Sequence, residues 1–314
     1  MYKKTAFLFP GQGAQYPLMA LDFLEEGSGE AERLFGIASE IMDRDMRAFL
    51  RGADRETLKR TDVSQPAITL ANLVSAAFLA ERGVQPALCA GFSLGEYAAL
   101  AVSGVIGGED CFRLVKARGE AMQEAADRSG GGMAAVLGLA PEKVEALITG
   151  WKIPDLYPAN FNSSKQVVVS GTAAALAEAE ERFKESGARR FVRLEVAGPF
   201  HSPLIARARE QFRPALDAVP FRDPSVPLYS NVTGRRVESG KEAKELALRQ
   251  ITSPVRWTEE EAAMAAEGLD AAVEAGPGKT LAGLWKDAAA VPCHPAGTVS
   301  DIKIMLEEKR AFGK

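Results

Sequence analysis

The first strongly patterned segment of the chain is an apolar run, Thr5–Phe9, which stops at the turn residues Pro10–Gly13. Apolar side chains at nearly every position indicate a strand covered on both faces, as in a parallel sheet. A helical pattern over Pro66–Arg82 precedes a second apolar run, Ala87–Gly91, and an Ala- and Leu-rich helical pattern, Leu94–Val102, follows it. Strands that alternate with helices in this way predict an α/β fold with a parallel sheet.

Between residues 129 and 198 the pattern changes to the order β-α-β-β-α-β. The expected strands are Met133–Leu139, Leu156–Phe161, Gln166–Ser170 and Arg190–Val196, and the expected helices are Pro141–Thr149 and Ala173–Ser186. This order is typical of a ferredoxin-like unit. We therefore predict a small ferredoxin-like subdomain at 129–198, inserted into a large α/β domain formed by 1–128 and 199–314. One continuous sheet is the alternative.

The remaining patterns belong to the large domain. A helical pattern covers about Met19–Phe49, and strands are expected at Val226–Ser230 and Ala271–Glu274. The 314 residues are 46% hydrophobic, enough for a large core, and the formal net charge is −4. Nucleic acid as the main partner is not expected, because phosphate binding needs a basic face.

Several absences in the sequence bear on location and cofactors. The start of the chain lacks the apolar stretch and cleavage site of a secretory signal, and the apolar run Ala67–Ala80 is too short to span a bilayer. Three scattered cysteines suggest reduced thiols. Metal ligands are not clustered at the usual spacings. We expect a cytoplasmic protein with no membrane partner and no metal.

The segment Gly91–Gly95 has the pattern G-x-S-x-G, with an expected strand before it and an expected helix after it. This is the context of a nucleophile elbow, in which a sharp turn exposes a strained serine and glycines leave room for the close backbone approach. Ser93 is therefore the candidate nucleophile. An ordinary strand-to-helix turn is the alternative.

A serine hydroxyl needs a base to remove its proton. The sequence has only two histidines, His201 and His294. His201 lies where the chain is expected to leave the small subdomain and rejoin the large one, and domain clefts are usual places for active sites. His294, between Cys293 and Pro295, has no charged or amide neighbour to orient it. We therefore expect His201 to be the base.

Several separated motifs occur in order along nearly the whole chain: Phe9–Gly13, the elbow Gly91–Gly95, Lys116–Gly119, Phe200–Ser202, Pro254–Trp257 and Glu274–Gly278. Together they resemble the malonyl-CoA:acyl carrier protein transacylase family. The resemblance implies Ser93 as nucleophile and His201 as general base. It further implies an oxyanion hole made by the backbone N–H groups of Gln12 and Leu94, and a histidine oriented by the backbone carbonyl of Gln250.

The resemblance also implies how the acyl group is chosen. Arg118 would hold the free carboxylate of the malonyl group, and a guanidinium suits this because it offers two parallel hydrogen bonds. A surface salt bridge is the alternative for Arg118. Phe200 would crowd an acyl chain branched at C2, although simple packing is also open. The family usually has histidine where Phe92 stands, so acyl selectivity or ester hydrolysis is expected to differ.

Two glycine-rich segments resemble nucleotide-binding motifs, but each lacks a glycine that its motif requires. Gly276–Thr280 ends like a phosphate-binding P-loop, but the first glycine of that motif would fall at Val273. Gly11–Gly13 lacks the third glycine of a dinucleotide fingerprint. Neither nucleotide hydrolysis nor NAD binding is expected.

The sequence thus predicts a ping-pong transfer of malonyl from malonyl-CoA to an acyl carrier protein, for fatty acid or polyketide synthesis, with no cofactor. The alternatives are a hydrolase that clears carrier proteins, a catalytically idle docking module and a generic esterase. Retention of Arg118 disfavours the hydrolase, and retention of Ser93 and His201 disfavours the docking module. Because carrier proteins are generally acidic, a basic patch is expected beside the cleft. Arg189 and Arg190 are candidates for it, or ordinary surface charges.

Overall fold

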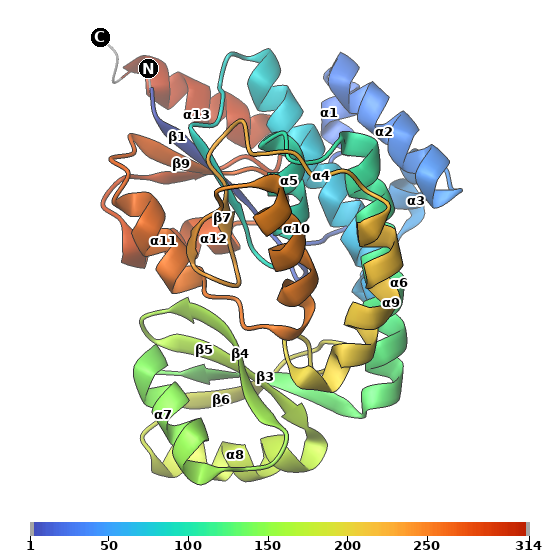
Figure 1. Cartoon of the computed structure of the whole chain (residues 1–314). Coiled ribbons are helices and arrows are strands. Elements are labelled where there is room, and N and C mark those ends of the chain that lie inside the picture. The colour runs from blue at the N-terminus through green and yellow to red at the C-terminus, as the bar shows by residue number, and fades with distance from the viewer. Residues whose placement is uncertain (1–2, 312–314) are drawn as a thin grey trace.

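The computed structural model describes residues 3–311 and consists of a large α/β unit and a smaller unit built on an antiparallel sheet (Figure 1). The predicted fold class, a hydrolase-like α/β domain with a ferredoxin-like subdomain, is confirmed. The alternative of one continuous sheet is wrong, because the strands form separate parallel and antiparallel sheets.

The large unit is organised around a parallel sheet with the strand order β10-β9-β1-β2. Its strands are β1 (Thr5–Phe9), β2 (Leu88–Gly91), β9 (Ala271–Glu274) and β10 (Cys293–Pro295). Every residue of β1, β2 and β9 is buried, as the apolar runs predict. Phe7 and Phe9 face the main core, whereas Ala6 and Leu8 pack in a second cluster with Trp257 and Trp285.

Helices lie on both faces of this sheet (Figure 1). They are α1 (Leu21–Glu25), α2 (Gly29–Met42), α3 (Met46–Gly52), α4 (Thr61–Glu81), α5 (Gly95–Val102), α6 (Gly108–Ser129), α9 (Ala206–Asp217), α10 (Gly240–Arg249), α11 (Trp257–Ala265), α12 (Thr280–Ala288) and α13 (Val299–Ala311). Two short strands, β7 (Tyr229–Ser230) and β8 (Arg235–Arg236), form a hairpin. Leu228 continues the parallel sheet through a bridge to Cys89 of β2.

The helical pattern expected over Met19–Phe49 is divided into three helices. The chain turns at Gly27 (φ 80°) and Asp43 (φ 49°), whose left-handed backbone cannot continue a right-handed helix. The strand expected at Val226–Ser230 shrinks to β7, and Pro227 within it cannot donate a ladder hydrogen bond.

Helix α4 begins at Thr61, five residues before the proline at which the pattern was expected to start, so Pro66 lies inside it. With 21 residues it is long and apolar enough to cross a membrane by those criteria alone. However, 83% of its most apolar window is buried inside the protein, between α2, α5 and α6. It is packed as a core helix.

The smaller unit contains β3 (Gly131–Leu137), α7 (Pro141–Trp151), β4 (Leu156–Ser163), β5 (Gln166–Thr172), α8 (Ala173–Glu185) and β6 (Arg190–Arg193). Its sheet has the order β4-β5-β3-β6 and all its pairs are antiparallel, which is the ferredoxin-like arrangement. Helices α7 and α8 cover the outer face (Figure 1). The other face of the sheet is directed toward the large unit (Figure 1). The exact limits of the subdomain, residues 129–198, stay a prediction.

Candidate active site

Ser93 lies in the turn between β2 and α5, with a left-handed backbone (φ 50°). The backbone segments around Ser93 approach each other so closely that only glycine fits at positions 91 and 95. A β-carbon on Gly91 would lie 2.0 Å from the carbonyl carbon of Gly95, and one on Gly95 would lie 1.9 Å from the carbonyl oxygen of Phe9. Strained backbone of this kind persists only when its surroundings fix it, and it is frequent at active sites.

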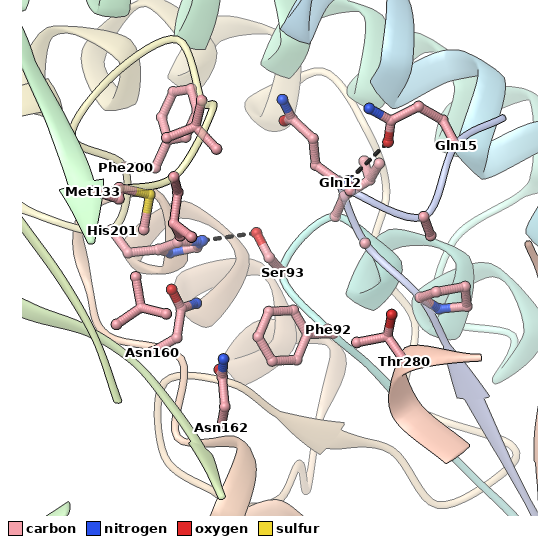
Figure 2. A pocket seen from close by; sticks show the side chains of 18 of the residues that line it. Gln12, Gln15, Phe92, Ser93, Met133, Asn160, Asn162, Phe200, His201 and Thr280 are labelled. Atoms are coloured by element: carbon pink, nitrogen blue, oxygen red, sulfur yellow. Dashed lines mark hydrogen bonds between the residues drawn. The ribbon is translucent and has the colours of Figure 1, made fainter. Parts of the chain in front are cut away.

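His201 lies directly against this serine, and the hydroxyl oxygen of Ser93 is 2.7 Å from its Nε2 (Figure 2). On the other side of the ring, Nδ1 is 3.0 Å from the carbonyl oxygen of Gln250 and 3.1 Å from that of Ser253. Carbonyls only accept hydrogen bonds, so Nδ1 carries the proton and Nε2 is free to accept the proton of Ser93. His201 also has a left-handed backbone (φ 56°).

The protonation state of His201 is set by its surroundings. Burial disfavours the charged ring and, together with the nearby cation of Arg118, lowers the pKa of His201 to about 4. The histidine is therefore neutral at physiological pH. A neutral imidazole held in this tautomer can act as a general base.

Arg118 extends from α6 into the same site and is only 1% exposed. Its Nη2 donates to the side-chain oxygen of Gln250 at 3.0 Å and to the hydroxyl of Ser93 at 3.3 Å. Its Nε has no hydrogen-bond partner within the described part of the chain. Burial lowers the pKa of Arg118, but an arginine starts so high that it stays charged. The expected alternative of a surface salt bridge does not describe this buried side chain.

Gln250 connects the members of the site. Its backbone carbonyl accepts from His201, its side-chain oxygen accepts from Arg118, and its Nε2 donates to the carbonyl of Ser93 at 3.0 Å. It lies in the short helical turn Gln250–Thr252 after α10 and is fully buried. One residue thus bonds His201, Arg118 and Ser93 at the same time.

Asn231 is a site residue that sequence reasoning missed. Its Oδ1 accepts from the backbone N–H of Ser93 at 2.7 Å, and its Nδ2 donates to the carbonyl of Gly91 at 2.8 Å. The same residue bonds two buried carboxyls, through its backbone N–H to Glu96 and through Nδ2 to Glu260, both at 2.7 Å. Asn231 follows β7, and only the tertiary fold brings it beneath the elbow.

The two carboxyls were also missed. Burial raises the pKa of Glu96 to about 7, and burial with the neighbouring Glu96 charge raises the pKa of Glu260 well above its usual value. Glu96 is one of the groups that keep the buried Arg118 cationic. Acidic residues on helices are usually at the surface, so sequence alone gave no reason to place these two in the core.

The expected oxyanion donors lie on the two loops that meet at Ser93. Gln12 follows β1 and Leu94 directly precedes α5, and both line the same cavity as Ser93. The loops touch at Gly11, where a β-carbon would lie 2.3 Å from the carbonyl oxygen of Phe92. N–H groups at a helix start have no intrahelical partner, so that of Leu94 is suited to bind an oxyanion.

A cavity of about 280 Å³ opens in front of Ser93 between the two units. Figure 2 shows Ser93 and His201 together with Phe92 and Phe200 around it. Phe92 packs edge-on against Trp257, with ring centroids 5.4 Å apart, while Phe200 is 5% exposed and its carbonyl accepts from Ser170 at 2.5 Å. The other side chains that line the cavity include Gln12, Gln15, Lys59, Leu94, Arg118, Met122, Met133, Asn160, Asn162, Val168, Leu194, Glu195, Val196, Thr280, Leu281 and Leu284.

Other residues considered in the sequence lie elsewhere. His294 is in β10 at the far edge of the parallel sheet and does not line the cavity. Arg189 and Arg190 are exposed at the start of β6 and do not line it either, so their part in a docking patch stays a prediction. No cluster of three or more potential metal ligands occurs among the described residues.

The arrangement can perform acyl transfer. A serine bonded to a neutral histidine can attack a carbonyl, backbone N–H groups can bind the resulting oxyanion, and a buried cation beside the serine can hold an acid-bearing acyl group. Fold and site thus define an acyl transferase, and the family model described as "Acyl transferase domain" matches residues 6–303.

The chain belongs to the malonyl-CoA:acyl carrier protein transacylase family, as the resemblance implied. It is 38% identical over 287 residues to the malonyl CoA-acyl carrier protein transacylase of Bacillus subtilis, covering 90% of each chain. The protein of the same name from Escherichia coli K12 is 36% identical over 283 residues, covering 90% of this chain and 91% of the other.

Solved structures agree in fold over nearly the full length. The malonyl CoA-acyl carrier protein transacylase of Clostridium perfringens has a TM-score of 0.93 at 34% identity, covering 99% of this chain and 98% of that one. A malonyl-transacylase solved in complex with its type II polyketide synthase acyl carrier protein has a TM-score of 0.91 at 32% identity, covering 97% and 99%.

Proposed function

We propose that the protein transfers a malonyl group from malonyl-CoA to the phosphopantetheine thiol of an acyl carrier protein, through an ester on Ser93. The observation that carries the assignment to malonyl is the buried guanidinium of Arg118, 3.3 Å from the nucleophilic oxygen. The names of the relatives, and the carrier-protein complex of one structural neighbour, support the same reaction.

In the first half-reaction the hydroxyl oxygen of Ser93 attacks the thioester carbonyl while Nε2 of His201 takes the hydroxyl proton. The carbonyl oxygen becomes an oxyanion held by the N–H groups of Gln12 and Leu94, each such donor contributing about 2.7–4 kcal/mol to the barrier lowering. When the carbonyl re-forms, the carbon–sulfur bond breaks. The coenzyme A thiolate then takes the proton from His201, which leaves malonyl-Ser93.

The second half-reaction reverses these steps with a new thiol. His201 takes the proton of the phosphopantetheine thiol, and the thiolate sulfur attacks the ester carbonyl of malonyl-Ser93. The oxyanion forms in the same place, the bond to the serine oxygen breaks, and His201 returns the proton to Ser93. This scheme needs no metal or redox cofactor, since malonyl-CoA and the carrier protein are both substrates.

Arg118 and the aromatic side chains account for the choice of acyl group. The guanidinium keeps donors available for a carboxylate, and a hydrolase for neutral acyl groups has no use for such a cation at its serine. Phe200 narrows the space for a branch at C2. Phe92, packed on Trp257, cannot make the hydrogen bonds of the histidine usual in the family.

The reaction serves fatty acid or polyketide synthesis, and we place it in the cytoplasm. Two cysteines, Cys89 and Cys111, are buried free thiols, and Cys293 is also unpaired. Free thiols suit a reducing compartment.

The selectivity of the enzyme for the malonyl group is tested by intact-protein mass spectrometry after brief mixing with malonyl-CoA, acetyl-CoA or methylmalonyl-CoA. The wild type is expected to gain a malonyl mass selectively, and Ser93→Ala to gain none. Arg118→Ala should lower malonyl loading about a hundredfold, because it removes a buried charge partner, and so narrow the preference over acetyl.

Arg113→Ala is the matched control, since Arg113 lies on the same helix but is exposed and paired with Glu109 and Asp110. It should leave loading unchanged. If acetyl loads as well as malonyl in the wild type, the malonyl assignment is wrong.

A further inference from the structure

The asparagine beneath the nucleophile elbow has every hydrogen-bonding group of its side chain occupied. The Oδ1 of Asn231 accepts from the N–H of Ser93 at 2.7 Å and from Nε2 of Gln250 at 3.3 Å. Its Nδ2 donates to the carbonyl of Gly91 at 2.8 Å and to Oε1 of Glu260 at 2.7 Å. Two donors thus face the oxygen and two acceptors face the nitrogen. A rotated amide would place like groups together, so the surroundings select this one orientation.

The backbone of Asn231 is held as firmly as its side chain. Its N–H donates to Oε2 of Glu96 in the first turn of α5 at 2.7 Å, and its carbonyl accepts from the N–H of Arg256 at 2.8 Å. Arg256 is the N-cap residue of α11, the helix that carries Glu260. One buried residue thus links α11 to the elbow and to α5, which begins just after the elbow.

The two carboxyls at this asparagine differ in their charge. Burial raises the pKa of Glu260 well above its usual value, and the neighbouring charges of Glu96, Glu261 and Glu259 raise it further. Burial raises the pKa of Glu96 only to about 7, because its hydrogen bonds and the cation of Arg118 act in the opposite direction. Two carboxyls this close do not both ionise, so Glu260 keeps its proton.

Glu260 is a costly residue in this position. Its side chain is fully buried, and its Oε2 has no hydrogen-bond partner within the described part of the chain. An unpaired buried oxygen destabilises the fold, and an apolar side chain would avoid that cost. What the carboxyl provides is an acceptor for Asn231. Ser93 needs such support, because strained left-handed backbone (φ 50°) persists only where its surroundings fix it.

We propose that Glu260 is a positioning residue, which orients the amide of Asn231 so that Asn231 holds the strained backbone of Ser93 in place for acylation. Neither Glu260 nor Asn231 lines the cavity, so neither is a catalytic residue. The inference rests on the acylation of Ser93 in the proposed function. It acts on the placement of the nucleophile rather than on substrate binding, so it should affect kcat more than KM. Misplacement of a reacting group by about 1 Å can lower the rate about a hundredfold.

The first part of the test is Asn231→Asp. One oxygen of the new carboxyl can still accept from the N–H of Ser93, but the other faces two acceptors, Glu260 and the carbonyl of Gly91. The native geometry then needs a second proton between the two carboxyls, and this proton is lost as the pH rises. The kcat for acylation should therefore fall about tenfold between pH 6 and pH 8, whereas that of the wild type stays constant.

The second part adds Glu260→Gln, so that acid and amide change places. In the double variant the amide nitrogen at position 260 can donate to the carboxylate at position 231. The kcat at pH 8 should rise about fivefold over that of Asn231→Asp, and the fall between pH 6 and pH 8 should disappear. A purely structural defect at Asn231 would not be repaired by a second substitution that removes an acid.

The single variants at Glu260 give an independent comparison. Glu260→Gln keeps an oxygen that accepts from Asn231, and its kcat should stay within about threefold of the wild type. Glu260→Leu removes that acceptor and should lower kcat about tenfold with KM nearly unchanged. This pair decides the question if the double variant does not fold.

Glu259→Gln is the matched control. Glu259 precedes Glu260 on α11, but it is exposed and pairs with Arg256, so this variant should change neither kcat nor its pH dependence. Acylation of Ser93 by malonyl-CoA is followed by rapid quenching and intact mass at each pH, and circular dichroism confirms that each variant is folded.

The proposal is overturned if kcat of Asn231→Asp does not depend on pH, or if Glu260→Gln does not restore it at pH 8. Equal losses in Glu260→Gln and Glu260→Leu would also overturn it, because the accepting oxygen would then have no effect. Failure of the proposed function is a separate outcome, since the wild type itself would then form no malonyl ester on Ser93.

Discussion

At the scale of single residues, the site depends on two side chains held in left-handed backbone conformations, Ser93 (φ 50°) and His201 (φ 56°). Such conformations cost free energy and need surrounding bonds to persist. Asn231 accepts from the N–H of Ser93, and Gln250 bonds both the carbonyl of Ser93 and the ring of His201. Ser93 and His201, the proposed nucleophile and base, are therefore held by the same small hydrogen-bond network.

The lowered pKa of His201 predicts the pH dependence of acylation. Because the ring is neutral above a pKa of about 4, kcat/KM for malonyl-CoA should stay constant from pH 8 to about 6 and fall to half near pH 4. Quenched loading of Ser93 measures this, with circular dichroism to confirm folding at each pH. A midpoint near the ordinary histidine value of about 6.5 would contradict the account.

The same pKa also affects stability. The unfolded chain binds this proton below a pKa of about 6.5 and the folded chain only near 4. The contribution of neutral His201 to stability is therefore present above about pH 6.5 and is lost as the pH falls toward 4.

At the scale of elements, β1 and β2 end side by side, and the loops that follow them carry Gln12 and Leu94, the proposed oxyanion donors. The register pairs Phe9 with Gly91, so the loop with Gln12 and the elbow with Ser93 start from adjacent positions. Glycine is required where these loops touch, since a β-carbon on Gly11 would lie 2.3 Å from the carbonyl oxygen of Phe92.

Gly11→Ala should therefore push the Gln12 loop away from the elbow. Losing one oxyanion donor lowers kcat by about 10²–10³-fold, and we expect a fall of this order with a smaller change in KM. Gly283→Ala is the matched control, because a β-carbon there meets nothing within 4 Å and the residue is inside α12. Equal kcat for Gly11→Ala and the wild type would show that the contact does not position Gln12.

Helix α11 buries a carboxyl that destabilises the protein at high pH. Burial raises the pKa of Glu261 to about 8, although its oxygen accepts from Nε1 of Trp257 at 2.7 Å. The folded state thus binds this proton more tightly than the unfolded state. The resulting stabilisation is complete below a pH of about 4.5 and is lost as the pH rises to about 8.

Glu261→Gln keeps an oxygen for Trp257 but cannot ionise. It should raise the free energy of unfolding at pH 8 by about 1–3 kcal/mol and have little effect at pH 5. Urea unfolding at the two pH values measures the difference. A variant less stable than the wild type at pH 8 would mean that the carboxylate is favoured in the fold.

At the scale of the whole molecule, the active site lies where the two units meet. The large unit supplies Ser93, Arg118 and Gln250, and His201 lies on the segment by which the chain returns from β6. Asn160 on the small sheet bridges to Val255 of the large unit. Residues of both units thus line the cavity, and the small unit supplies the wall opposite Ser93.

Much of this arrangement could be predicted from local sequence. The strands of the parallel sheet are unbroken apolar runs, and the elbow glycines follow from a close approach that admits no side chain. With two histidines in the chain, position near the subdomain junction was enough to favour His201. The oxyanion donors and Arg118 came from the resemblance, and their roles stay proposals.

The remaining features of the site and the fold could not be predicted, because they depend on tertiary contacts between residues far apart in the sequence. Asn231 lies beneath the elbow, three residues after Leu228 bridges to β2, and it bonds the buried carboxyls of both Glu96 and Glu260. The start of α4 at Thr61 was missed because Pro66 resembles a helix start, whereas packing against α2 and α6 extends the helix before it. Tertiary packing overrides local propensity in such cases.

The most direct test of the central claim is the fate of the ester on Ser93. Malonyl-loaded enzyme is separated from coenzyme A and placed either in buffer alone or in buffer that contains phosphopantetheinylated acyl carrier protein. The masses of both proteins are then followed over time by mass spectrometry. The account predicts that the carrier gains the malonyl mass on the order of a hundredfold faster than water removes it from Ser93. Loss of the ester at the same rate with and without carrier, with release of free malonate, would contradict it.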